Sequence, residues 1–120
     1  MTVLTQGIQP YEFLLSEANG MRSRGQATVT VAGGVSLPSG TVLGKITASG
    51  KLIKYLDGAA DGSQAAVAVL GTPLVGVANG DYKATVFERD CEVIGKYLNG
   101  GVALDAPGIA DLKALGVLVR

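Results

Sequence analysis

Short runs of β-branched and apolar residues, each closed by a turn signal, are the feature that most constrains the fold of this chain. Residues 27–31 read Ala-Thr-Val-Thr-Val and alternate with the period of two that is typical of a half-buried strand. Gly33-Gly34 then interrupts the run. The 18 glycines among 120 residues are explained by many tight turns between short strands. The pattern predicts one β-rich domain with no internal repeat.

Further strands are expected along the chain. Residues 41–47 and 51–56 flank the turn Ala48-Ser49-Gly50 and predict a hairpin, with a bulge or close backbone approach at Gly44. Residues 63–69 allow a short helix or a strand, and their apolar character on both faces favours a buried strand. Asn79-Gly80 is a hairpin turn signal. The remaining extended segments are expected at residues 74–78, 82–88, 91–94 and 117–119.

The helical signal is confined to the C-terminal part. Asp105 before Ala106-Pro107 is a helix start, and Gly116 is a natural stop. Apolar residues recur at every third position between them, namely Ile109, Leu112 and Leu115. The predicted class is therefore α+β, mostly β: a small single domain of short strands and hairpins with one short C-terminal helix.

Residues 1–25 differ from the rest. Residues 1–10 lack periodicity, and Phe13, Leu14 and Leu15 form an apolar run with no partner run nearby. We interpret residues 1–25 as an extended N-terminal arm that is ordered weakly or not at all in the isolated protein, and residues 26–120 as the β-rich domain. The alternative is that residues 13–15 cap the domain's own core.

Composition excludes several classes of function. Ten basic residues balance ten acidic ones, so the basic excess of a protein that grips nucleic-acid phosphates is absent. The chain has no histidine, the commonest general base and metal ligand, and we expect neither catalysis nor a cofactor. The single Cys91 excludes an internal disulfide and is expected to be a small core residue. We find no signal peptide and no apolar run near the ~20 residues of a membrane span, and expect a protein made and used in solution.

Two local patterns can be interpreted either as functional sites or as ordinary structural features. Asp57 and Asp61, each followed by glycine, suggest a calcium loop, but the bidentate glutamate that usually completes such a loop is missing, which favours two turns held by Asx hydrogen bonds. Lys83 near Asn79-Gly80 suggests a biotin- or lipoyl-type carrier domain. Lys83 lies inside a predicted strand, however, whereas a modified lysine must protrude.

Four segments together carry a resemblance to a known family: residues 13–24, 40–51, 55–69 (with Asp-Gly-Ala-Ala-Asp-Gly-Ser at 57–63) and 112–120. In this order they resemble the head decoration proteins of tailed bacteriophages, the family of the lambda-type capsid-stabilising protein, over nearly the whole chain. The resemblance implies a non-enzymatic virion protein that adds as trimers to the outside of the expanded capsid and stabilises it against internal DNA pressure. The chain departs from the family at residues 94–107, which are short where the lambda-type member carries a Pro-containing insertion with Trp.

The apolar runs and arginines of the sequence also predict where the chain makes these contacts. The expected capsid-binding residues lie in the arm: Phe13, Leu14, Leu15, Arg22 and Arg24. We expect the arm to add as a strand to an exposed sheet edge of the shell, with the two arginines meeting carboxylates there. The expected trimer interface is the stripe Ile109, Leu112 and Leu115, and the alternative is that this stripe packs wholly within the monomer.

The expected partners are the phage major capsid protein and further copies of the chain, without direct contact to nucleic acid or membrane. The expected location is the outer surface of the capsid, after synthesis in the host cytoplasm. A competing hypothesis is an unrelated β-rich interaction module of a phage tail or adhesin.

Overall fold

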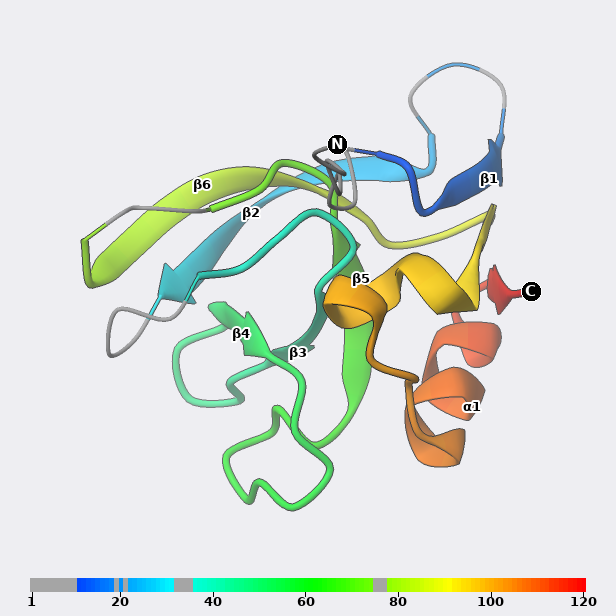
Figure 1. Ribbon diagram of the computed structural model, residues 1–120. Helices are drawn as coiled ribbons and strands as arrows, with labels where there is room; N and C mark the ends of the chain where they lie inside the picture. Colours follow the sequence, from blue (N-terminus) through cyan, green and yellow to red (C-terminus); the bar gives the residue numbers. More distant parts are fainter. Residues whose placement is uncertain (1–10, 19, 21, 32–35, 75–77) are drawn as a thin grey trace, which may run out of the picture.

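The computed structural model describes residues 11–120 except positions 19, 21, 32–35 and 75–77. Within these residues the elements are β1 (Leu14–Glu17), β2 (Arg24–Val31), β3 (Val42–Lys45), β4 (Leu52–Lys54), β5 (Ala66–Leu70), β6 (Gly80–Phe87), β7 (Cys91–Val93), the 3₁₀ helix η1 (Gly95–Gly101), α1 (Ala106–Ala114) and β8 (Val117–Val119). Strands dominate, and α1 lies at the C-terminal end (Figure 1). The predicted α+β, mostly β class is confirmed.

Five strands close into a barrel in the order β2-β4-β3-β5-β6 (Figure 1). Its longest ladder is antiparallel and joins β2 to β6, from Arg24 opposite Phe87 to Val31 opposite Gly80. The hairpin predicted around residues 48–50 is confirmed as β3 and β4. The barrel closes where β2 meets β4 in parallel through the pair Val29 and Leu52. Alternate side chains of these strands fill the interior with aliphatic residues.

Gly44 confirms the predicted irregularity in β3. The register of β3 against β5 shifts between Leu43 and Gly44. A Cβ atom at position 44 would overlap the backbone of Ser63, so only glycine allows the two segments to approach this closely.

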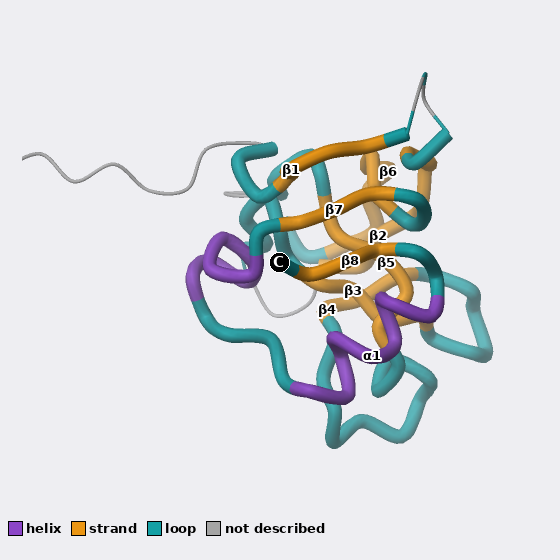
Figure 2. The backbone as a smooth tube through the Cα atoms, turned by 90° about the vertical axis from the view of Figure 1, so that its right-hand side faces the viewer, coloured by secondary structure: helices purple, strands orange, loops and turns teal. Residues whose placement is uncertain are grey.

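The other three strands form a second sheet in the order β1-β7-β8, and Figure 2 shows them side by side. β1 is antiparallel to β7, and β8 is parallel to β7. Parallel neighbours need a long crossover connection, and η1 with α1 supplies it between β7 and β8. A second apolar cluster includes residues of this sheet, α1 and the barrel, and its fully buried members include Phe13, Phe87, Val93, Leu98 and Leu112.

The C-terminal helix forms as its sequence predicts. Asp105 is the N-cap, and its Oδ1 accepts a hydrogen bond from the Gly108 N–H at 2.9 Å. Gly116 follows the helix with a φ of 88°, a conformation that favours glycine. None of the helices in the described part of the chain is long and apolar enough to cross a membrane.

Some expectations need correction. The apolar run at residues 13–15 has a partner, since residues 14–17 form β1 against β7 and Phe13 is buried in the core. Leu74 forms an isolated bridge with Leu37, while residues 75–77 of the expected hairpin lie outside the described residues. The 3₁₀ helix η1 was not expected, and its Leu98 is buried.

Candidate functional site

The five residues expected to contact a capsid gather around β1 and the start of β2, but their exposure differs. Phe13 is fully buried, and its ring meets the ring of Phe87 edge-on at 5.5 Å between centroids. Leu14 is half-buried, whereas 52% of Leu15 is exposed. Only part of the predicted apolar run is therefore available to a partner.

The two arginines also differ in what they contact. Arg22 is exposed, and its Nε lies 3.4 Å from Asp90 Oδ2. Arg24 is half-buried and makes a two-point hydrogen bond to Glu17, at 3.0 Å from Nε and 2.8 Å from Nη2. This bond is the main reason that the pKa of Glu17 is lowered and the pKa of Arg24 is raised. Arg24 thus already has a carboxylate partner inside the chain, and Arg22 is the arginine with an accessible head group.

Sequence reasoning missed the role of Tyr11. Its backbone N–H donates to Ser39 Oγ at 2.9 Å, and the Ser39 hydroxyl donates to the Gly71 carbonyl at 2.8 Å. Its ring lies edge-on to Phe87 with the centroids 5.8 Å apart. The scarcity of aromatic residues was the available signal: the chain has only two phenylalanines, and both pack in the apolar cluster beside Tyr11.

The residues of the expected trimer stripe also differ in exposure. Leu112 is fully buried in the monomer's own core, while Ile109 and Leu115 are 38% and 41% exposed. Ile109 borders a shallow hollow that also involves Gly95, Leu104 and Val119. Two of the three predicted residues are accessible to a neighbouring subunit.

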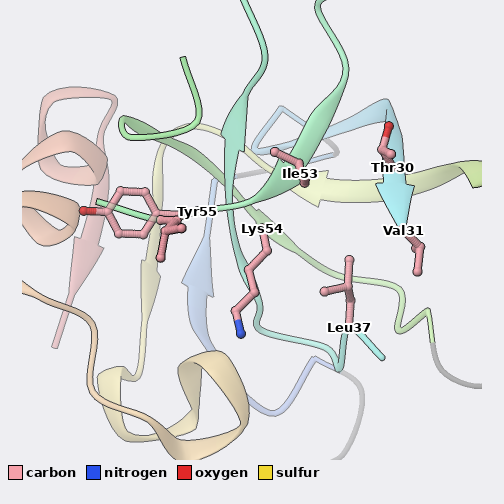
Figure 3. Close-up of a pocket in the computed structure, with 7 residues that line it drawn as sticks. Thr30, Val31, Leu37, Ile53, Lys54 and Tyr55 are labelled. Atoms are coloured by element: carbon pink, nitrogen blue, oxygen red, sulfur yellow. The ribbon is translucent and has the colours of Figure 1, made fainter. Parts of the chain in front are cut away.

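A separate apolar hollow of about 260 Å³ lies where β2 and β4 diverge beyond the pair Val29 and Leu52. Figure 3 shows Ile53, Val31 and Leu37 lining it together with Lys54 and Tyr55. Leu56 lies at its border and is 64% exposed. The lining side chains are mostly apolar, with the hydroxyls of Thr30 and Tyr55 and the ammonium group of Lys54, and they contain neither a carboxylate nor a thiol.

The structure shows the surroundings of three residues with reactive side chains that the sequence singles out, Asp61, Cys91 and Lys83. Asp61 Oδ1 accepts hydrogen bonds from the Ser63 backbone N–H and hydroxyl, which lowers the pKa of Asp61. Burial, with Glu17 and Asp90 nearby, raises the pKa of the Cys91 thiol to about 11. Lys83 is exposed in the middle of β6, opposite Thr28. No group of three or more metal-ligating side chains occurs within the part of the chain that the structure covers.

The accessible groups of this small β-rich domain are apolar and ionic, the kinds of group through which structural proteins contact their partners. The family model described as bacteriophage lambda head decoration protein D matches residues 3–117 of the 120-residue chain. The chain therefore belongs to this family of phage head decoration proteins, which supports a structural role at the phage capsid. A search of curated proteins gave no match.

Proposed function

We propose that this protein is a cement protein that binds the outer surface of the expanded capsid as trimers and stabilises the shell against internal DNA pressure. The observation that carries the proposal is the family match over residues 3–117. The partner is the major capsid protein, and no direct contact with nucleic acid is needed. Many copies, each with modest affinity, resist pressure jointly because rupture must break several contacts at once.

The capsid-binding arm of this proposal consists of residues 2–10. Phe13 is buried and residues 14–17 form β1 of the folded domain, so we assign to the arm only the residues before Tyr11. An extended segment can add as a strand to an exposed sheet edge, where backbone hydrogen bonds supply affinity. Leu15 and Arg22, both exposed close to the start of the domain, extend the same contact. Phe13 supports it from within the core, and the half-buried Leu14 packs against that core.

The trimer interface of this proposal is the accessible part of the helix α1 stripe. Ile109 and Leu115 supply apolar area to a neighbouring subunit, and Val102 is a further exposed apolar residue in the segment that precedes the helix. Leu112 supports the stripe from the monomer's core. Three identical contacts related by a three-fold axis close on themselves, which limits the assembly to a trimer.

Deleting residues 2–10 tests the proposal. The truncated protein should melt within a few degrees of the wild type, because it keeps Tyr11 and Phe13, which pack in the apolar cluster. It should no longer co-sediment with expanded capsid shells, which the wild type should bind in preference to unexpanded shells. Unchanged binding of the truncated protein would remove the arm from the mechanism.

A matched pair of point variants refines the test. Leu15→Glu and Leu56→Glu make the same change at two exposed leucines, one on β1 and one beside the hollow at β4. We expect only Leu15→Glu to weaken binding to expanded shells. Equal binding of both variants would exclude β1 from the contact.

A further inference from the structure

We propose that Tyr11 sits in a socket that fixes where and in which direction the capsid-binding arm leaves the domain. The Tyr11 socket consists of Ser39, Gly71, Phe87 and Arg24. The inference rests on the proposed function, because it gives the socket a role only if residues 2–10 bind the shell. In this role Tyr11 is a positioning residue and need not touch the capsid.

The backbone of Tyr11 has an unusual conformation that the socket holds. Its φ is 62°, in the left-handed region that residues other than glycine rarely adopt. The Tyr11 N–H donates to Ser39 Oγ at 2.9 Å, and the Tyr11 carbonyl accepts from the Leu14 N–H at 3.0 Å. Ser39 is itself fixed, because its hydroxyl donates to the Gly71 carbonyl. Both backbone polar groups of Tyr11 are thus bonded before any partner arrives.

The ring of Tyr11 is held on two sides. Phe87 meets it edge-on, and the Arg24 guanidinium carbon lies 5.3 Å from the Tyr11 ring centroid and 5.0 Å from that of Phe87. Gly71 leaves the space that the ring occupies, because a Cβ atom there would lie 2.9 Å from Tyr11 Cε1. The ring therefore sits on bare backbone, with Arg24 against its face.

Arg24 is in turn locked by Glu17. The two-point bond to Glu17 fixes the plane of the guanidinium, so one side chain ties β1, β2 and Tyr11 together. Segments far apart in the sequence thus converge on the residue that follows the arm. Tyr11 is ordered when the domain folds. The entropic cost of ordering it therefore does not reduce the free energy of binding of the arm.

Loss of the socket should therefore weaken binding without removing any capsid contact. Tyr11→Ala removes the ring, so the residue must be ordered again each time the arm binds. Fixing one residue's backbone corresponds to about tenfold in an equilibrium constant, and we expect shell binding about tenfold weaker or more. Arg24→Lys keeps the charge but loses the two-point bond and the planar contact, and should weaken binding in the same direction. Tyr11→Phe keeps the ring and should restore binding.

The matched control is Tyr82→Ala. Tyr82 is also half-buried, but it packs against the interior of the barrel from β6. Affinity for expanded shells is measured at 25 °C by co-sedimentation, and the melting temperature of each variant is measured separately. If the role of Tyr11 is purely structural, Tyr11→Ala should lower the melting temperature, as Tyr82→Ala should, and leave the affinity at 25 °C unchanged.

Weaker binding of Tyr11→Ala and Arg24→Lys, with wild-type binding of Tyr11→Phe and Tyr82→Ala, is the expected result. Tyr11→Ala could instead bind shells with wild-type affinity while deletion of residues 2–10 abolishes binding. That result would refute the role of the socket and leave the proposed function intact. Wild-type binding of the deletion variant would exclude residues 2–10 from the contact, and the socket would lose its role with them.

Discussion

Phe13→Ala distinguishes a free N-terminal segment from one that is built into the core. The sequence alone suggested that residues 13–15 have no partner within the chain, and a free segment can lose its phenylalanine at almost no cost in stability. In the structure Phe13 is fully buried, packs edge-on against Phe87, and has its Cδ1 3.3 Å from where a Cβ atom of Gly40 would lie. Truncation to alanine would remove these contacts and leave a cavity beside Phe87 and Gly40.

The expected loss is large. Truncating a buried phenylalanine to alanine typically lowers the free energy of unfolding by about 3–5 kcal/mol. A domain of this size is expected to have a total stability of roughly 6–18 kcal/mol. At about 3–5 °C per kcal/mol, the melting temperature should fall by roughly 10–20 °C.

Urea unfolding followed by circular dichroism measures this loss, and Leu15→Ala is the control. Leu15 is two positions along, is 52% exposed, and should change the free energy of unfolding by about 1 kcal/mol or less. A loss below about 1 kcal/mol for Phe13→Ala would refute the burial of this segment. It would also return residues 11–17 to the arm.

Two further predictions concern assembly and pH. Ile109→Lys places a charge in the proposed trimer interface and should convert a sedimenting trimer into a monomer; wild-type protein that is monomeric at micromolar concentration and still binds shells would contradict the trimer. Burial raises the pKa of the Cys91 thiol from its usual value near 9 to about 11, so between these pH values the unfolded state loses a proton that the folded state keeps. The free energy of unfolding should fall across that window, and the fall should be shallower in Cys91→Ala. An equal slope in both proteins would exclude Cys91 as the cause.

Local signals in the sequence predicted the elements that depend on local physics. The hairpin of β3 and β4, the irregularity at Gly44, the strand β8 and the start and end of α1 all follow from turn residues, caps and periodicity. Asp105 and Gly116 are examples in which one residue type at one position determines the backbone.

Pairing between distant segments was not predictable in this way. Nothing in residues 14–17 indicates that β1 finds β7 about 75 positions later, because a short strand is specified by its partner more than by its own composition. The closure of the barrel through the pair Val29 and Leu52 was not predictable for the same reason. The candidate site was predicted least well from the sequence, because the burial of Phe13 and the hydrogen bond between Arg24 and Glu17 depend on these long-range contacts.

The boundary at Tyr11 changes what the N-terminal segment can do. An arm of 25 residues would have to be ordered largely on binding, at roughly 1–2 kcal/mol for each backbone residue. In the function proposed above, an arm that ends before Tyr11 leaves the ordering of residues 11–17 to folding, where the burial of Phe13 and the β1–β7 pairing offset it. Nine or ten residues in extended form still reach up to about 35 Å, enough to cross to a neighbouring protein surface. A short arm with a fixed root would lose less entropy on binding than a long free one. In the proposed function Phe13, Leu14 and Arg24 therefore serve the contact by shortening the arm, whereas Leu15 and Arg22 extend it.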